Sequence, residues 1–497
     1  METIDFMDLK LRRRNSIMLM IGYVLIGLAI LMITTIFVFM AEGFDYQNGH
    51  VIQNGMVYVS SIPNPAQIYI NGALYSSGTD TRILLPAGTY NFKLQRTGYR
   101  NWQHTVVVTG GQVFYYDYPF LFPDNLTANA VQTYTSAPAF MTQSLDQHWL
   151  VITQASSLTS FDLYDLTNPQ QLPTTISLPS GLLSPATTSQ SLQPIAWSND
   201  NSHLLLKHTY DNNIEYILMN ISAPDQSVNL TKTLLLPTSN IDLQLNNKQS
   251  DQYLILNSAN QTLYKDSLSS PQLQLYASKV LAYKAYGSNT LLYATPDQSK
   301  ASQVDIDLNN GSQTYTIRRL PASTTYLLNL TTYDNNLYVA IAASNDSLAY
   351  VYENPINQIT DQQIGVAVPV EVFSLTSPNY LTFSDNAQYI LFENGPNLAV
   401  YDTENAQGYS YTLPTPLDQP QTHVSWMDGA QLTYVSNGQL EVFDYDNTNR
   451  QTLVSADSRY PVYFVPNYKY VYTLVPSIAN SAQELLTSTA LLTPANL

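Results

Sequence analysis

Hydrophobic and polar residues follow three different patterns along the chain. Residues 17–41 form one apolar stretch without a charged residue (IMLMIGYVLIGLAILMITTIFVFMA). From about residue 55 to residue 123, short alternating runs are separated by turn dipeptides at close spacing. From about residue 124 onward, bursts of alternating apolar and polar residues recur at a longer spacing. These patterns predict one long helix followed by two mainly β modules.

The apolar stretch 17–41 is long enough to cross a membrane. At about 1.5 Å per residue it spans roughly 37 Å as a helix, against a hydrocarbon core of about 30 Å. Lys10, Arg12, Arg13 and Arg14 precede the stretch, and Glu42 and Asp45 follow it. The positive-inside rule then predicts a cytoplasmic stub at residues 1–16 and an extracytoplasmic remainder, in a single-pass protein of the cell membrane.

A cleaved signal peptide is the alternative interpretation of this stretch. The apolar region of a signal peptide is usually 7–15 residues long and ends in small residues at the cleavage site. Here the stretch is longer, and Phe39 stands three residues before the only suitable site, after Ala41. We therefore expect an uncleaved anchor.

Residues 42–54 are polar and are expected to be a linker, and residues 55–123 then carry strand and turn signals. Val57–Val59, Ile68–Ile70 and Ile83–Leu85 are apolar runs typical of strands. Asn71-Gly72 is the dipeptide preferred in a two-residue type I′ hairpin, because both of its residues accept a positive φ. Short strands at such close spacing predict a small antiparallel β-sandwich.

The order of motifs in this module resembles the PEGA domain, a surface-layer-associated β-sandwich module of prokaryotes. The motifs are PNPAQIYING, Gly78-Thr79, LPAGTYNFKL and Gly98-Tyr99. The tetrapeptide that names the family would fall on Pro63–Ala66, where Asn64 and Pro65 depart from it. The resemblance implies a non-catalytic spacer or adhesive module at the cell envelope, and it implies no ligand.

Residues 124–497 contain an internal repeat. Leu163–Asn168, Val400–Asn405 and Val442–Asn447 share an Asp-x-x-Asn pattern, and looser copies lie between them. The seven anchors, positions 165, 220, 266, 307, 353, 402 and 444, have a mean spacing of 46.5 residues. A turn with an aromatic residue, Ser and a nearby Asp precedes several anchors, as in Trp197–Asp200 and Phe383–Asp385.

A repeat of about 40–50 residues with four short strands is typical of a β-propeller blade. Its elements resemble TolB-like and WD40-like blades, although the full Gly-His and Trp-Asp signature is absent. An eighth unit begins near Tyr460 and lacks a fourth strand, which residues 130–134 could supply by closing the ring. We expect eight blades, with seven as the alternative.

Composition and charge exclude several classes of protein. The chain has 497 residues, a formal charge of −17 and no cysteine, which rules out disulfides, thiolate metal sites and a cysteine nucleophile. The excess of acidic residues argues against binding of nucleic acid, which needs clustered Lys and Arg.

No local motif for catalysis, cofactor binding or metal binding is found. Asp305, Asp307 and Asn309 mimic the start of a calcium loop, but Gly311 and Thr316 stand where the loop pattern would not place them, so a plain turn is expected. The six histidines form no metal-binding spacing. The aromatic run Phe114–Pro123 and Trp102 are expected to pack, with an exposed binding strip as the alternative.

The sequence favours a non-catalytic, membrane-anchored envelope protein of bacteria that is a platform for a protein or a cell-wall glycan. The alternative is an extracytoplasmic hydrolase or lyase that acts on glycan in the propeller channel. Acidic or basic residues clustered at the narrow end of the channel would favour the enzyme. A purely structural role would show as a broad apolar patch on one face.

Overall fold

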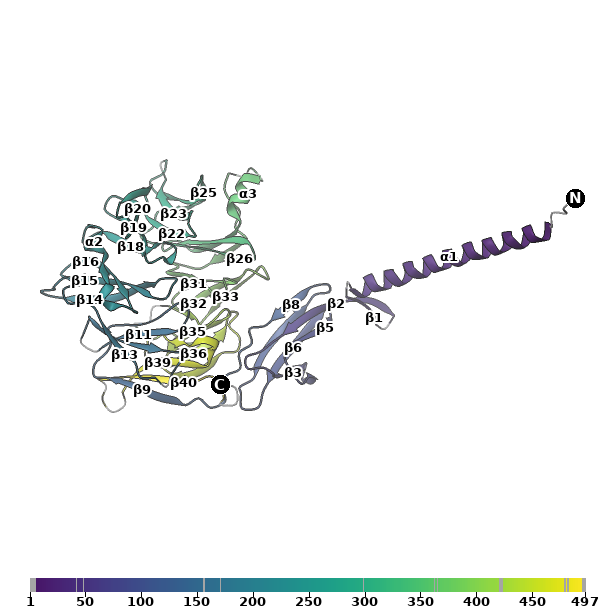
Figure 1. Cartoon of the computed structure of the whole chain (residues 1–497), viewed down its shortest axis with the longest axis horizontal. Coiled ribbons are helices and arrows are strands. Elements are labelled where there is room, and N and C mark those ends of the chain that lie inside the picture. Colours follow the sequence, from purple (N-terminus) through teal and green to yellow (C-terminus); the bar gives the residue numbers. More distant parts are fainter. Residues whose placement is uncertain are drawn as a thin grey trace. The chain divides into compact units, whose positions relative to one another are not determined.

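The computed structural model describes residues 6–41, 43–47, 49–154, 157–169, 171–297, 299–361, 363, 365–419, 423–477, 480 and 482–493. The chain divides into two compact units, residues 1–124 and 125–497. Both units are built mainly of strands, and one long helix, α1 (Phe6–Ala41), belongs to the first unit (Figure 1).

In the first unit, two four-stranded sheets follow α1. One sheet contains β1 (Phe44–Gln47), β2 (His50–Val59), β5 (Thr81–Pro86) and β8 (Val113–Tyr116), and β8 pairs in parallel with β2. The other has the order β4 (Ala73–Ser76), β3 (Gln67–Ile70), β6 (Gly88–Gln95), β7 (Trp102–Val108). One core joins the two sheets, with Val57 and Ile83 from the first and Ile68, Phe92 and Trp102 from the second.

Two sequence expectations for this sandwich are confirmed. Asn71 and Gly72 both have a positive φ and connect β3 to β4, as a type I′ hairpin requires. Trp102 is buried in the core, so the packing interpretation holds and Trp102 is no part of an exposed strip. In the run that follows, β8 is the last strand of the sandwich and Phe120–Phe122 are buried, while Tyr115 is exposed.

The expectation that residues 42–54 form a linker needs correction, because most of them lie in strands. Residues 44–47 form β1, and the first five residues of β2 also fall in this range. The two strands pair from Phe44–Gln53 to Gln47–His50. The polar composition concealed a hairpin that is held by backbone pairing and by the stacking of Phe44 on Phe39, while Tyr46 and Val51 are exposed.

The second unit contains eight four-stranded antiparallel sheets, numbered here in chain order. Sheets 1–4 are formed by β10 (Met141–Gln143), β11 (Trp149–Thr153), β12 (Ser160–Asp165) and β13 (Thr174–Ser177); β14 (Gln190–Trp197), β15 (His203–Tyr210), β16 (Asn213–Asn220) and β17 (Val228–Asn229); β18 (Ile241–Leu245), β19 (Gln252–Asn257), β20 (Thr262–Ser267) and β21 (Gln274–Ser278); and β22 (Ala282–Tyr286), β23 (Thr290–Pro296), β24 (Gln303–Asn309) and β25 (Thr314–Pro321).

Sheets 5–8 repeat this order. They are formed by β26 (Tyr326–Tyr333), β27 (Asn336–Ala343), β28 (Leu348–Glu353) and β29 (Glu371–Ser374); β30 (Tyr380–Phe383), β31 (Tyr389–Asn394), β32 (Asn397–Asp402) and β33 (Gln407–Thr412); β34 (Ser425–Trp426), β35 (Gln431–Ser436), β36 (Gln439–Asp444) and β37 (Gln451–Ser455); and β38 (Tyr463–Phe464), β39 (Tyr470–Pro476), β40 (Glu484–Ala490) and β9 (Ala128–Tyr134). Short helices lie between strands: η1 (Pro224–Gln226), α2 (Leu230–Thr233), η2 (Asn246–Lys248), α3 (Pro355–Asp361) and η3 (Pro466–Tyr468).

All seven anchors fall on the third strand of successive sheets, from Asp165 on β12 to Asp444 on β36. The polar turns that precede them join the first strand to the second. In three of these turns, Ser144, Ser198 and Ser384 donate to the acid or amide two residues later and accept from the backbone N–H five residues later. The predicted order of strands and turns within a repeat is therefore confirmed.

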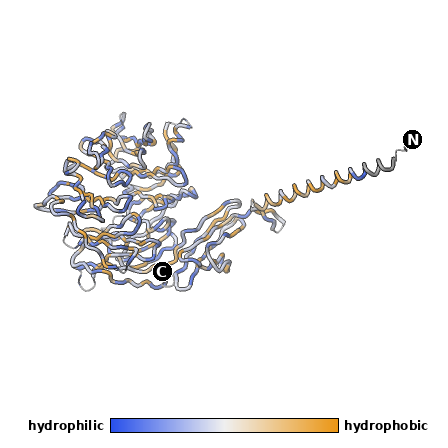
Figure 2. Tube along the Cα trace, in the orientation of Figure 1, coloured by the Kyte–Doolittle hydropathy of each residue, from blue (hydrophilic) through white to orange (hydrophobic). Residues whose placement is uncertain are grey.

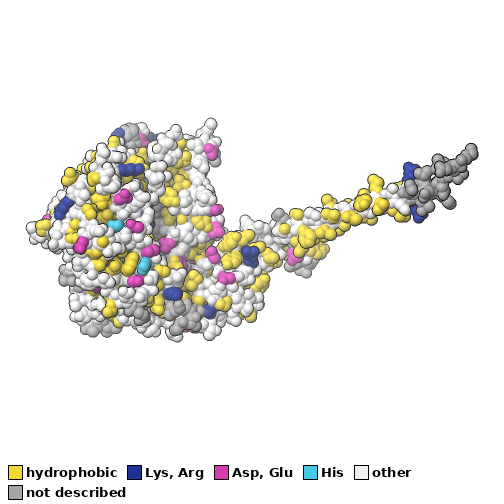
Figure 3. All heavy atoms as spheres, in the orientation of Figure 1, with side chains coloured by type: hydrophobic (Ala, Val, Ile, Leu, Met, Phe, Trp, Pro, Cys, Tyr) yellow, Lys and Arg dark blue, Asp and Glu magenta, His cyan; other side chains and the backbone are white. Residues whose placement is uncertain are grey.

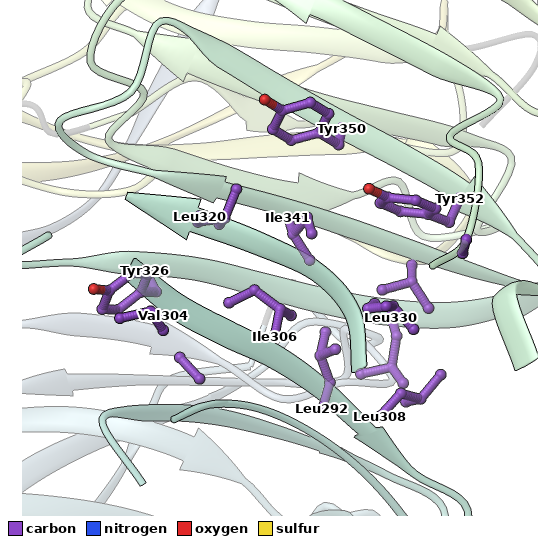
Figure 4. Close-up of a cluster of buried hydrophobic side chains, with 14 of the residues drawn as sticks. Leu292, Val304, Ile306, Leu308, Leu320, Tyr326, Leu330, Ile341, Tyr350 and Tyr352 are labelled. Atoms are coloured by element: carbon purple, nitrogen blue, oxygen red, sulfur yellow. The ribbon is translucent and has the colours of Figure 1, made fainter. Parts of the chain in front are cut away.

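Buried side chains join each sheet to the next. Sheets 4 and 5 share a core in which Leu292, Ile306 and Leu308 meet Leu330 and Ile341 (Figure 4). Similar shared cores lie between sheets 1 and 2, 2 and 3, 3 and 4, and 5 and 6. Between sheets 6 and 7 the rings of Tyr389 and Tyr445 stack 4.1 Å apart, and between sheets 7 and 8 Thr473 Oγ1 donates to the Ser455 carbonyl.

The last sheet also packs on the first. Tyr134 and Leu486 of sheet 8 share a core with Leu150 of sheet 1. β9 pairs along β40 from Tyr134–Glu484 to Ala128–Thr489, so the two ends of this unit lie side by side (Figure 1). This is the strand expected from residues 130–134. Successive four-stranded sheets, each packed on the next, are the arrangement of a β-propeller.

Candidate functional site

α1 is the one described helix that is long and apolar enough to cross a membrane. The qualifying segment is Arg13–Ala41, and none of it is buried inside the protein. Hydropathy colouring shows the apolar residues continuing to the end of the helix (Figure 2). A helix that is apolar on all sides and has no buried residue exposes its side chains to water at a large cost, unless lipid surrounds it.

The four basic residues expected to fix the topology all lie on α1, in its first turns. Arg13 and Arg14 are exposed, while the side chains of Lys10 and Arg12 lie outside the described part of the chain. Basic side chains flank the start of the apolar band, and hydrophobic side chains follow it to its far end (Figure 3). At that far end Asp45 is exposed, and Glu42 lies outside the described residues.

In the second unit, the first strands of the sheets converge on a common axis. β14 contacts β18, and β26 contacts both β22 and β30. The side chain of Gln143, on β10, donates to the carbonyl of Phe464, on β38, at 2.6 Å. The turns after these first strands also meet, because the backbone N–H of Asn199 in sheet 2 donates to the Lys248 carbonyl in sheet 3 at 2.8 Å.

Five ionisable residues from different sheets lie on the first strands or on the turns that follow them. They are Lys248 (sheet 3), Lys284 (sheet 4), Asp385 (sheet 6), Asp428 (sheet 7) and Tyr468 (sheet 8). Their charges influence one another, since Lys248 lowers the pKa of Asp385 and of Lys284. We call these five residues the axial cluster.

The surroundings shift the pKa values of the axial cluster. Burial raises the pKa of Asp428 to about 6, the charge of Asp385 adds to this rise, and the N–H groups of Gln431 and Ala430 oppose it. Desolvation by the surrounding protein raises the pKa of Asp385, and desolvation together with Lys248 lowers that of Lys284, although both residues are exposed to solvent. Acidic and basic residues from several sheets thus influence one another's charge.

One further pair of ionisable side chains is fully buried, in sheet 2. His208 Nδ1 lies 2.8 Å from Glu215 Oε1. Ser184, through its N–H and its hydroxyl, and Asn229, through its side-chain amide, also donate to Glu215. Burial alone would raise the pKa of Glu215, but these hydrogen bonds outweigh it and lower the pKa to about 2. In a Ser-His-acid relay the histidine accepts the proton of the serine hydroxyl. Here the Ser184 hydroxyl donates to Glu215 and not to His208, so these residues do not form such a relay.

The residues that mimic a calcium loop form a turn that closes on itself. Asn309 accepts from the N–H of Gly311 at 2.7 Å, Asp307 accepts from the Thr316 hydroxyl at 2.6 Å, and Asp305 pairs with Arg319 at 2.9 Å. Within the described residues, no three His, Asp or Glu side chains are arranged to hold a metal ion.

Sequence reasoning did not find the axial cluster or the His208–Glu215 pair. Asp385 and Asp428 were recognised only as turn residues. His208 and Glu215 are seven residues apart on neighbouring strands, which is an ordinary spacing across a hairpin. For Asp385 and Asp428, the one indication in the sequence is the repeat itself, because it places the turns that carry these residues at the same end of their sheets.

Comparison with known proteins finds a family match for the first module. Residues 54–120 match the family model described as the PEGA domain. No curated protein matches the sequence of the chain.

Among solved structures, the second unit is similar to several propellers. One is Kluyveromyces lactis Hsv2, at 13% identity over 66% of this chain and 98% of that chain, with a TM-score of 0.37. Another is the β-propeller domain of Myceliophteria thermophila Cps50 (Swd1), at 11% over 74% and 100%, with a TM-score of 0.37. The Dos1 propeller matches at 11% over 73% and 96%, with a TM-score of 0.45. Similarity at this level says nothing of what this chain binds.

Proposed function

We propose that the chain is a non-catalytic, single-pass envelope protein that displays a binding platform outside the cell membrane. Residues 17–41 cross the membrane, residues 1–16 are cytoplasmic, and Lys10, Arg12, Arg13 and Arg14 set this orientation. The PEGA-type sandwich at residues 55–123, extended by the β1–β2 hairpin, holds residues 124–497 outside. The eight sheets are the eight blades of a closed propeller, which binds a protein or a cell-wall glycan.

One observation carries this proposal: an apolar helix with no buried side chain in its span runs directly into a PEGA-type sandwich. The helix needs lipid to cover it, and the resemblance of the sandwich points to the envelope. The propeller supplies a rigid surface of polar turns, with no assembled catalytic relay among the residues described.

The topology can be tested on intact cells because the chain has no cysteine. A single cysteine at Ser270→Cys, in an exposed turn of sheet 3, should react with a membrane-impermeant maleimide. Asn15→Cys, at the cytoplasmic end of α1, should react only after permeabilisation. The reverse pattern would overturn the orientation, and release of a shortened chain into the medium would support a cleaved signal peptide.

The binding role can be tested with the full-length protein in detergent micelles. If glycan is the partner, the protein should sediment together with purified, insoluble cell-wall glycan. If a protein is the partner, crosslinking in cells through Ser270→Cys should capture that protein. Failure of both would overturn the platform.

The axial cluster favours an enzyme as the second candidate. Two carboxyl groups from sheets 6 and 7, one with a pKa of about 6, resemble the acid and base that glycoside hydrolysis requires. Release of reducing ends from cell-wall glycan that is lost in both Asp385→Asn and Asp428→Asn would establish this function. No release by the wild-type protein would exclude it for that substrate.

A further inference from the structure

The sandwich exposes apolar side chains on the sheet that follows α1. Leu84, Val113 and Tyr115 of this sheet are exposed, and Arg82 is exposed beside them. The opposite sheet also exposes apolar side chains, namely Leu74, Tyr75 and Val107. What distinguishes the first sheet is its position, because it directly follows the end of α1 in the chain.

The sheet that follows α1 borders a groove beside the helix. The groove has a volume of about 530 Å³ and lies between the last two turns of α1 and strands β1, β2 and β5. Its lining is mainly apolar, with Ile36, Phe39 and Met40 of the helix and Tyr46, Val51 and Leu84 of the sheet. Thr35, Asp45 and Asn54 also line it, so polar groups are present beside the apolar ones. The rings of Phe39 and Phe44 stack 4.5 Å apart and fix the hairpin against the helix.

The position of the groove along the helix sets its surroundings. Thr35, at one end of the groove, lies six residues before the end of α1, which is about 9 Å along the axis. The apolar stretch exceeds the hydrocarbon core by only about 7 Å, so this end of the groove reaches the boundary between headgroups and acyl chains. Tyr side chains, such as that of Tyr46 on the hairpin, are enriched at that boundary.

We infer that this groove binds the acyl chain of a membrane lipid and that the β1–β2 hairpin lies in the headgroup layer. This inference rests on the proposed membrane anchor. A lipid chain is the occupant because the groove is mainly apolar, open along its length and continuous with the lipid-facing surface of α1. Its function is to fix the sandwich at the membrane surface, where the helix alone would leave it free to swivel.

The depth of the hairpin can be measured with single cysteines, since the chain has none. Fluorophores are attached at Val51→Cys and Leu84→Cys, both 56% exposed in the wild type, and at Leu28→Cys in the middle of α1. Leu74→Cys on β4 is the matched control, because Leu74 is also 56% exposed but lies on the opposite sheet. The full-length proteins are placed in phosphatidylcholine vesicles containing doxyl lipids.

We expect a shallow doxyl group to quench positions 51 and 84, a deep one to quench position 28, and neither to quench position 74. If position 28 is quenched but positions 51 and 84 are no more quenched than position 74, the lipid site is overturned and the membrane anchor stands. No quenching at 28 overturns the anchor itself. Shielding of 51 from both lipid and aqueous iodide means that protein covers the groove, which also overturns the inference.

Occupation of the groove is tested with a phosphatidylcholine that carries a photoreactive group on its acyl chain. Crosslinks should map to residues 44–51 as well as to α1. Leu84→Glu should reduce the crosslinks to the hairpin several-fold, whereas Leu74→Glu should leave them unchanged. Equal crosslinking in both variants would show that no lipid chain enters the groove.

Discussion

At the scale of single residues, Glu215 and Asp428 show how neighbours decide the charge of a buried carboxyl group. Burial acts on both in the same direction, toward a higher pKa. Four donors surround Glu215 and reverse the effect. Asp428 accepts two backbone N–H groups and faces another acid, so burial prevails.

Glu215→Gln should destabilise the protein at pH 7 by about 1–3 kcal/mol, because the amide cannot accept all of the hydrogen bonds made by the carboxylate. The lowered pKa means that the contribution of Glu215 is present above its unfolded value of about 4.3 and is lost as the pH falls toward 2. Urea unfolding of the protein in micelles should therefore show a weaker acid dependence between pH 4.5 and 2 in the variant. Asp225→Asn, an exposed acid in η1, is the control, and an unchanged slope in Glu215→Gln would contradict the prediction.

Asp428→Asn should have the opposite signature. A raised pKa means that the stability contribution is full below about pH 4 and is lost as the pH rises through 6, by about 2 kcal/mol. The asparagine variant keeps an acceptor for Ala430 and Gln431 but cannot ionise. Its free energy of unfolding should fall less than that of the wild type between pH 4 and 7, while Asp361→Asn on α3 should behave as the wild type does. Parallel pH curves for Asp428→Asn and the wild type would refute this.

At the scale of elements, the turns set the register of each sheet. The turn between β35 and β36 is centred on Asn437 and Gly438, both with a positive φ, as Asn-Gly predicts. The turn between β31 and β32 also contains an Asn-Gly dipeptide, Asn394-Gly395. There, however, Asn394 pairs with Asn397, so Gly395 and Pro396 form the centre. The dipeptide locates such a hairpin, but strand pairing decides which residues turn.

Gly438→Ala should cost about 1 kcal/mol, because alanine is strained at a φ of 68°. No atom lies within 4 Å of the added Cβ, so the cost is conformational and not steric. Gly365→Ala is the control, since Gly365 is equally open and lacks a positive φ. Thermal unfolding of both variants checks this, and equal midpoints would argue against it.

At the scale of the whole molecule, the second unit holds together by packing between neighbouring sheets and by strand pairing between its two ends, in a chain without cysteine. β9, near the start of the second unit, pairs with β40 near its end. This pairing is the most distant in sequence of those described within the unit.

A disulfide across the closing pair should stabilise the ring. Asn129 and Ser488 are directly paired, and opposite residues on antiparallel strands lie within disulfide reach. Asn129→Cys/Ser488→Cys should gain about 5 kcal/mol when oxidised, because the bond closes a very long loop in the unfolded chain. The matched pair Glu441→Cys/Thr452→Cys within sheet 7 closes a short loop and should gain less, about 3 kcal/mol. Oxidised and reduced forms compared by denaturant unfolding test this, and an equal gain in both pairs would count against ring closure as the weak point.

The sequence by itself determined the features that depend on near neighbours. The apolar stretch, the Asn71-Gly72 hairpin, the seven anchors and the polar turns all follow from the periodicity and turn chemistry of a few adjacent residues. Which distant residues come together depends on the tertiary structure. Lys248 influences the charge of Asp385, Glu215 contacts His208 and Ser184, and the β1–β2 hairpin forms a groove with α1. Such contacts depend on how a closed ring or a packed sandwich brings distant segments together, and no local pattern encodes that distance.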